Sequence, residues 1–152
     1  DLTHLHDDSG NTGTGFSFTL GEGNDLVCKS AQFFAEQLKG RDIEELMANF
    51  GAVFNELSNE QQFRWLGPHK GVAHLGLASV TNACYDLWAK KRGVPLWKLL
   101  IDLKPEEIVN TLDLSYLEDE MTRDQAIELL QSNVGGKEER SEIIEKSITD
   151  NT

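Results

Sequence analysis

Hydrophobic and polar residues alternate along the first twenty positions of the chain. Residues 2–6 and 15–20 each have the pattern of a short strand, and residues 7–11 between them (Asp-Asp-Ser-Gly-Asn) have the composition of a tight turn. The pattern predicts an antiparallel β-hairpin whose inner face carries Phe16 and Phe18. Because two strands alone are only marginally stable in water, we expect helices or another strand to cover that face.

The hydrophobic period becomes that of helices after residue 23. Apolar residues recur every three or four positions over residues 24–39, 42–57 and 71–92, and Gly40 and Gly93 are placed to end the first and third of these helices. The helix over 71–92 carries small residues on several sides. We therefore expect it to pack closely against more than one neighbour.

Shorter elements follow the same rules. Ser58 and Gln61 have the spacing of a capping box, which predicts a short helix ending near Trp65. Residues 108–114 (Ile-Val-Asn-Thr-Leu-Asp-Leu) read as a strand, and residues 122–131 as a helix capped by Thr with Gln three residues later. A strand followed by a helix is how a parallel α/β unit begins.

Together these elements predict an α+β fold in two parts. Residues 1–103 are expected to form a hairpin or longer meander followed by a helical bundle. Residues 104–152 are expected to form a separate unit that opens with one strand and one helix and ends in a polar tail. The charge also changes there, since this second part holds 13 acidic and 5 basic residues.

The overall charge limits the partners of the chain. The formal net charge is −12, which argues against unaided binding to nucleic acid or to an anionic membrane, because both attract Lys and Arg. No apolar run is long enough to predict a membrane span. The first residues have neither signal nor transit character and no initiating Met, so we expect the chain to be trimmed at its front.

The two cysteines bear on the compartment. Cys28 and Cys84 lie far apart in predicted helices and have no CxxC spacing. Two buried thiols in a reducing compartment are favoured over a disulfide. The expected location is therefore cytoplasmic or mitochondrial, and secretion is not expected.

The segment Thr-His-Leu-His-Asp-Asp-Ser at residues 3–9 resembles the T-H-x-H-x-D-H zinc signature of metallo-β-lactamase-fold hydrolases. Ser9 replaces the last histidine, no strand precedes the segment, and the other two histidines do not follow strands. Alternation along a strand places His4 and His6 on the same side, which allows weak metal affinity. The ligands that zinc requires are not all present, so a zinc hydrolase is not predicted.

Other segments that could suggest a functional site lack the neighbouring elements or partner residues that the site would require. Residues 10–15 (Gly-Asn-Thr-Gly-Thr-Gly) run into a strand rather than a helix, so they predict a hairpin turn and not a phosphate loop. Asp113 is the one carboxylate placed near the end of a predicted strand, where barrel active sites gather, but it has no partner in the sequence. No G-x-S-x-G, Cys-His pairing or H-E-x-x-H occurs.

The most distinctive stretch is Gln-Phe-Arg-Trp-Leu-Gly-Pro-His-Lys-Gly at residues 62–71. An Arg and a Trp on a short helix before a Gly-Pro break predict a rigid corner. One interpretation is that Trp65 fills the gap between helices. The functional alternative is that Trp65, His69 and Lys70 form a lip over a neighbouring active site.

A family resemblance rests on the segments that follow. Residues 83–90 read Ala-Cys-Tyr-Asp-Leu-Trp-Ala-Lys and residues 93–100 read Gly-Val-Pro-Leu-Trp-Lys-Leu-Leu. They resemble the A-x-W-D-x-x-(A/G)-K and G-x-P-(V/L)-x-x-L-L segments in the amino-terminal cap domain of the enolase superfamily (mandelate racemase/muconate lactonizing enzyme-like), with Tyr85 in place of the usual Trp. Residues 18–23 (Phe-Thr-Leu-Gly-Glu-Gly) and 64–71 (Arg-Trp-Leu-Gly-Pro-His-Lys-Gly) are similar to the L-fuconate dehydratase branch.

The resemblance implies Mg²⁺-assisted dehydration of a sugar acid. In that family a Lys or His base removes the proton α to the carboxylate, and the metal stabilises the enediolate. These groups lie on later strands of a TIM barrel, and a whole barrel takes about 250 residues. We therefore expect a cap-domain fragment without its first strand, with no catalytic, cofactor-binding or metal-binding residue and with no Mg²⁺ bound by this chain.

Two functions remain open at this point. The first is a fragment of an acid-sugar dehydratase that is inactive alone and whose sugar-acid substrate belongs to the full-length enzyme. The alternative is a non-catalytic, stand-alone cap domain that acts as a protein-interaction module. In either case the cap face that normally covers the barrel would be exposed, and it could mediate homo-oligomer formation or another association.

Overall fold

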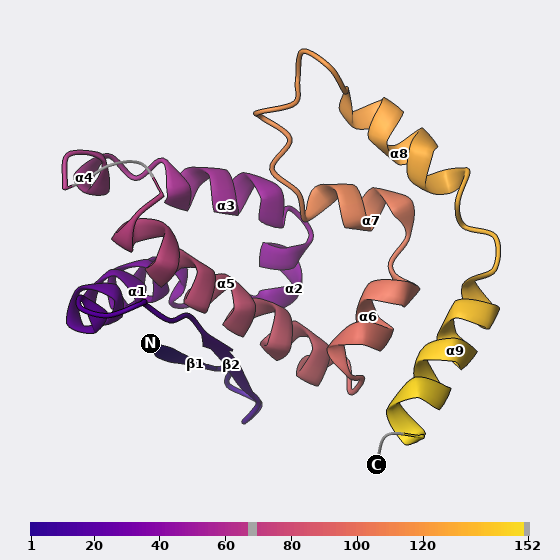
Figure 1. Cartoon of the computed structure of the whole chain (residues 1–152), viewed down its shortest axis with the longest axis horizontal. Helices are drawn as coiled ribbons and strands as arrows, with labels where there is room; N and C mark the ends of the chain where they lie inside the picture. Colours follow the sequence, from indigo (N-terminus) through magenta and orange to yellow (C-terminus); the bar gives the residue numbers. More distant parts are fainter. Residues whose placement is uncertain (67–69, 151–152) are drawn as a thin grey trace.

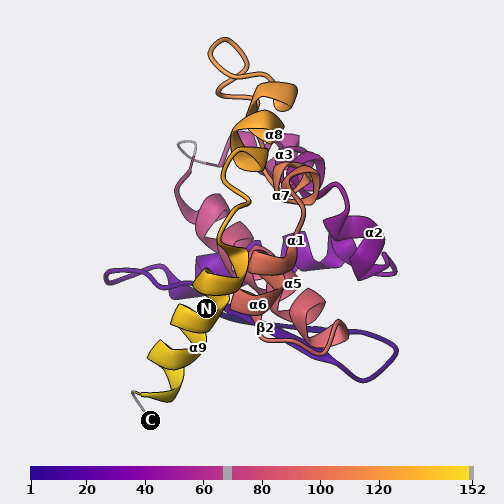
Figure 2. The same ribbon diagram turned by 90° about the vertical axis from the view of Figure 1, so that its right-hand side faces the viewer.

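The computed structural model describes residues 1–66 and 70–150. The helices and strands follow one another in the order β1 (Leu2–His6), β2 (Thr12–Phe16), α1 (Asn24–Leu38), α2 (Ile43–Met47), α3 (Phe50–Ser58), α4 (Gln61–Arg64), α5 (Val72–Lys91), α6 (Leu96–Asp102), α7 (Pro105–Asn110), α8 (Arg123–Gln131) and α9 (Lys137–Thr149). Helix α5 runs through the middle of the molecule, and the β1–β2 hairpin and helix α3 lie on opposite sides of it (Figures 1 and 2). The predicted α+β class is confirmed.

Helix α5 is buried on several sides, as its small residues predict. Its large buried side chains include Leu77, Val80 and Trp88, which join the central core with residues of α1, α2 and α3. A Cβ atom at Gly76 would lie only 2.6 Å from the backbone nitrogen of Ala31, so this glycine lets α1 and α5 touch closely. The helix therefore packs against the hairpin and against α1, α2, α3 and α6.

The hairpin packs on α5 through glycine rather than through aromatic residues. The inner positions of β2 are Gly13 and Gly15, and a Cβ atom at Gly15 would lie 2.0 Å from the carbonyl oxygen of Ser79. The prediction of a second strand over residues 15–20 with an aromatic inner face is wrong. Phe16 lies on the side of β2 away from α5 and is 64% exposed, and Phe18, which follows the strand, is 66% exposed.

The turn of the hairpin forms as its composition predicts. One carboxylate oxygen of Asp7 accepts hydrogen bonds from the backbone N–H groups of Ser9 (3.0 Å) and Asn11 (2.8 Å). The Asn11 side chain donates to the other oxygen at 2.8 Å, and this bond is the main reason why the pKa of Asp7 lies below its usual value. The turn sets the pairing of the strands, in which His4 faces Thr14 and His6 faces Thr12.

Two details of the helical region differ from the sequence-based expectation. The predicted helix over residues 42–57 is two helices, because Asn49 leaves the helical conformation (φ −142°) between α2 and α3. Asp42 caps the first of them, since its side chain accepts from the backbone N–H groups of Glu44 and Glu45. The predicted capping box of Ser58 and Gln61 is wrong: the Glu60 side chain caps α4, and the Ser58 hydroxyl donates to the carbonyl of Asn55.

The strand predicted over residues 108–114 is also wrong. Residues 105–110 form helix α7, with Pro105 at its first position and the Glu107 carboxylate accepting from the backbone N–H of Lys104 at 2.8 Å. These are helix-start signals, and they outweigh the strand pattern of the apolar residues. The expected barrel-like strand is thus absent from this part of the described chain.

The remainder of the second part follows the sequence more closely. The capping box of Thr122 and Gln125 opens α8 as predicted, and the tail forms α9, in which no residue is buried. The division after residue 103 stays a prediction.

Neither cysteine forms a disulfide within the described residues. Cys84 is buried, which raises the pKa of its thiol to about 12, but Cys28 is exposed, so its predicted burial is wrong. Among the helices of the described ranges, none is both long and apolar enough to span a bilayer.

Candidate functional site

The predicted lip begins at α4, which aromatic contacts hold on α1. The ring of Phe63 lies 4.6 Å from that of Phe33 and 5.1 Å from that of Phe34, centroid to centroid. Two residues after Phe63, the side chain of Trp65 is 75% exposed, so the interpretation that it fills a gap between helices is wrong. A packed helix thus presents an exposed indole at its end.

The other lip residues adjoin the start of α5. Lys70 is exposed and has a positive φ of 83°, which few residues other than glycine adopt, just before α5 begins. His69 lies outside the described residues. Trp65 and Lys70 are therefore available to a neighbouring molecule or domain, and their role as a lip stays a prediction.

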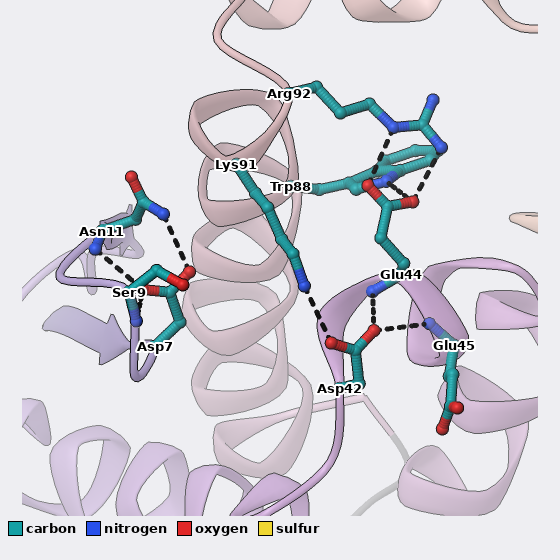
Figure 3. Close-up of polar contacts among 9 residues, drawn as sticks. All are labelled: Asp7, Ser9, Asn11, Asp42, Glu44, Glu45, Trp88, Lys91 and Arg92. Carbon is teal, nitrogen blue, oxygen red and sulfur yellow. Dashed lines mark hydrogen bonds and ion pairs between the residues drawn. The ribbon is translucent and has the colours of Figure 1, made fainter.

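A charged cluster joins α2 to the last turn of α5 (Figure 3). The Glu44 carboxylate accepts hydrogen bonds from Arg92 Nε (3.0 Å), from Arg92 Nη2 (2.7 Å) and from the indole Nε1 of Trp88 (2.9 Å). The Arg92 guanidinium lies over the Trp88 ring, 4.5 Å from its centroid. Beside them, Lys91 Nζ donates to Asp42 at 2.8 Å.

The electrostatics of this cluster are those of a structural clamp. The hydrogen bond from Arg92 lowers the pKa of Glu44, and this effect together with the bond from Trp88 outweighs burial, which acts in the opposite direction. The same pair raises the pKa of Arg92. Although Glu44, Trp88 and Arg92 line a cavity of about 120 Å³, a paired carboxylate of low pKa is a poor general base. We assign the cluster to stability rather than to chemistry.

Only part of this cluster can be predicted from the sequence. Trp88 and Arg92 are four residues apart, a spacing that brings side chains together on a helix. Glu44 precedes Arg92 by 48 positions, and no local pattern links the two. The cluster was therefore missed at the level of sequence.

The Glu44 contacts predict a pH dependence of stability. Because the pKa of Glu44 is lower in the folded chain than its ordinary value of 4.5, its contribution is complete above that value and is lost as the pH falls through the folded pKa. Glu44→Gln should lower the free energy of unfolding by about 1 kcal/mol at pH 7. Urea denaturation at pH 7 and pH 3 measures how much the free energy of unfolding falls on acidification. This fall should be smaller in the variant than in the parent chain, and equal falls would contradict this assignment.

Asp113 is held in a local hydrogen-bond network. Its carboxylate accepts from Asn55 Nδ2 on α3 at 3.1 Å and from the backbone N–H of Ser115 at 3.1 Å. Burial acts to raise its pKa, but the hydrogen bonds from Ser115 and Asn55 outweigh burial and lower it. Asp113 thus ties the turn after α7 to α3, and these bonds give it no catalytic role.

The described residues do not fit a magnesium site. No group of three or more His, Cys, Asp or Glu side chains within residues 1–66 and 70–150 is arranged to hold a metal ion.

The two hairpin histidines share one face, as predicted. His4 Nδ1 lies 3.1 Å from Thr14 Oγ1, and His6 Nδ1 lies 2.9 Å from Thr12 Oγ1. Both rings are exposed on the side of the hairpin that faces away from α5.

No protein-family model matches the chain. It is 42% identical to L-galactonate dehydratase of Hypocrea jecorina over 138 residues, and this matched region covers 91% of this chain and 31% of that protein. It is 40% identical to mitochondrial enolase superfamily member 1 of Homo sapiens over 133 residues, and this matched region covers 88% of this chain and 30% of that protein. The chain therefore spans about a third of the length of the curated relatives that it matches.

The structural comparison agrees with the sequence comparisons. The crystal structure of human mitochondrial enolase superfamily member 1 superposes with a TM-score of 0.84 and 37% identity, over 94% of this chain and 32% of the human chain. The motifs over residues 83–100 pointed to the same family from the sequence. The chain belongs to the enolase superfamily and has the fold of the amino-terminal cap domain of that family.

Proposed function

We propose that the chain is the cap portion of an acid-sugar dehydratase of the L-fuconate dehydratase type. The observation that carries this proposal is the 42% identity over 138 residues to a protein named L-galactonate dehydratase. The reaction proposed for the complete protein is removal of the proton α to a carboxylate followed by loss of water. Mg²⁺ would stabilise the enediolate when bound to the barrel portion.

The role of this chain in that reaction would be to cover the active site. The exposed indole of Trp65 can exclude water from a neighbouring site, and the cationic Lys70 can attract a sugar-acid carboxylate. Neither residue would take part in proton transfer. A cytoplasmic or mitochondrial location belongs to the same proposal and is supported by the name of the human relative.

Exposed apolar side chains support the idea that another domain covers the second part of the chain. Those that are at least 47% exposed after residue 110 and before α9 are Leu112, Tyr116, Leu117, Leu129 and Val134. A surface of this kind marks an interaction site. It also suits the alternative function, a non-catalytic module that binds another protein or a second copy of the chain.

The experiment is a dehydration assay of the isolated chain with Mg²⁺ and L-fuconate or L-galactonate. We expect no release of the 2-keto product above the buffer control, because the described residues offer neither a metal site nor an unpaired base beside one. Turnover by the isolated chain would contradict the proposal that the chemistry lies elsewhere. If the chain is instead a non-catalytic protein-interaction module, it should give no turnover even when it is joined to a dehydratase barrel.

A further inference from the structure

One edge of the hairpin, along β2, carries backbone groups that β1 does not bond. At the open end of the hairpin, the backbones of Asp1 and Ser17 bond each other in both directions. Bonded and non-bonded pairs alternate along an antiparallel ladder, so Thr12, Thr14 and Phe16 turn their N–H and C=O groups away from β1. A row of such groups is a template for pairing with another strand.

Three polar side chains of α5, spaced four residues apart, bond these outward groups. The contacts are those of Asn82 Nδ2 with the carbonyl of Phe16 (3.4 Å), of the Asp86 carboxylate with the N–H of Thr14 (2.7 Å) and of Lys90 Nζ with the carbonyl of Thr12 (2.8 Å). Lys90 also donates to Asp86 at 2.7 Å. We call Asn82, Asp86 and Lys90 the polar stripe. The stripe therefore bonds β2 where a further strand would otherwise do so.

The spacing of the two elements explains why a helix can take this place. Four residues advance a helix by about 6 Å, and two residues advance a strand by about 6.7 Å, so the two series stay nearly in step over the length of β2. Gly15 lets the backbones approach closely, since a Cβ atom there would lie 2.0 Å from the carbonyl oxygen of Ser79. The next member of the series on α5 is Ala78, which has no polar side-chain atom, and β2 ends at Phe16.

We infer that the polar stripe protects the edge of β2 against the addition of another strand. Such a strand would need the N–H of Thr14, which is already bonded, and would have to displace the side chains that lie along the edge. The side chains of Asp86 and Lys90 are 30% and 48% exposed, so the strand would also have to remove water from two charges. Charged side chains at a sheet edge are a known means of preventing edge-to-edge pairing.

This role accounts for two residues that the proposed function does not use. Asp86 and Lys90 are the charged positions of the segment over residues 83–90, whose other members include the buried Ala83 and Trp88. The buried members pack in the core, and the charged members bond the hairpin. The inference is independent of the proposed dehydratase function, because it concerns assembly and not chemistry.

Amide hydrogen exchange tests the central bond of the polar stripe. Asp86→Ala removes the acceptor of the Thr14 N–H and keeps a good helix former. Exchange of the Thr14 amide should accelerate about 10-fold to 100-fold, as expected for the loss of a hydrogen bond to a charged group. The amides of Gly13 and Gly15, which bond within the hairpin, should keep their protection, and this distinguishes the effect from unfolding.

Asp102→Ala is the matched control for this experiment. Asp102 forms an i,i+4 ion pair with Lys98 in α6, as Asp86 does with Lys90 in α5, but it does not bond the hairpin. Its substitution should leave exchange of the Thr14 amide unchanged. Equal exchange of this amide in the parent chain and in Asp86→Ala would overturn the inference.

Sedimentation analysis of the 152-residue chain tests the protection itself. The double variant Asp86→Ala/Lys90→Ala frees the N–H of Thr14 and the carbonyl of Thr12, so it should self-associate about 10-fold more tightly than the parent chain. Adding Thr14→Pro removes that N–H, at an edge position where proline is tolerated, and should restore the association of the parent chain.

Pairing through β1 is equally available to the parent chain and to both variants, so the comparison isolates the edge of β2. A double variant that sediments like the parent chain would overturn the inference. Tighter association that persists after Thr14→Pro would also overturn it, because the association would then not use this edge.

Discussion

Gly15→Ala is expected to lower the free energy of unfolding by about 3 kcal/mol, at the upper end of the cost of overpacking. The added Cβ atom would lie 2.0 Å from the carbonyl oxygen of Ser79 and 2.4 Å from the backbone nitrogen of Ala83. Both atoms belong to the backbone of α5, so no side chain can rotate away to make room. The hairpin would have to move off the helix, which also strains the buried contact between the hydroxyls of Thr3 and Ser79 at 2.7 Å.

Thermal denaturation followed by circular dichroism measures this effect. For a chain of this length, about 3 kcal/mol corresponds to a fall in the Tm of roughly 10 °C. Gly135→Ala is the matched control, because a Cβ atom there meets nothing within 4 Å, and its Tm should not fall. If Gly15→Ala melted at the temperature of this control, the close approach of β2 to α5 would be refuted.

Trp88→Ala is expected to cost about 4 kcal/mol of stability, in the range found for removing a large aromatic side chain from a core. Trp88 is 3% exposed, and its indole Nε1 donates to Glu44 while its ring lies under Arg92. The substitution removes the core packing of the indole. It also removes the contacts of the indole with Glu44 and Arg92, which join α2 to α5. The loss should therefore exceed that caused by Glu44→Gln alone.

The same substitution at an exposed tryptophan provides the control. Trp65 is 75% exposed, so Trp65→Ala should change the free energy of unfolding by less than about 0.5 kcal/mol. Trp88→Phe should lie between the two, since it keeps an aromatic ring but loses the hydrogen bond to Glu44. Urea denaturation measures all three; a larger loss for Trp65→Ala than for Trp88→Ala would contradict the burial described for these residues.

The helices with complete local signals were predictable from the sequence. Gly40 and Gly93 adopt the positive φ expected where α1 and α5 end, and Thr122 with Gln125 forms the capping box that opens α8. In each case neighbouring residues alone determine the conformation. The hairpin turn at Asp7 belongs to the same class, because its hydrogen bonds all lie within four residues.

The errors arose where distant contacts decide the conformation or where two local signals conflict. Phe16 and Phe18 have a strand-like pattern, yet the position of β2 is set by the fit of Gly13 and Gly15 against α5, more than 60 residues later in the chain. The segment over 108–114 shows a conflict between two local signals, in which the helix start at Pro105 prevailed over the apolar pattern. The Glu44–Arg92 pair could not be foreseen, because nothing near either residue specifies the other.

For function, the family motifs were more informative than any local arrangement of reactive groups. The segments over residues 83–100 form the end of α5 and the start of α6, and they are built for packing rather than chemistry: Ala83, Trp88 and Leu99 are all buried. They could therefore indicate the family without identifying a substrate. The lip residue Trp65 is the reverse case, since its exposure makes it available for function and gives it little part in the core.

The most direct test of the cap-domain proposal is a chimera in which this chain replaces the matching third of L-galactonate dehydratase from Hypocrea jecorina. The chimera should unfold cooperatively and dehydrate its sugar acid in the presence of Mg²⁺, at a rate well above that of the remaining two thirds of the enzyme alone. A chimera that unfolds cooperatively but turns over no faster than that truncated enzyme would contradict the proposal that this chain is the cap of an acid-sugar dehydratase.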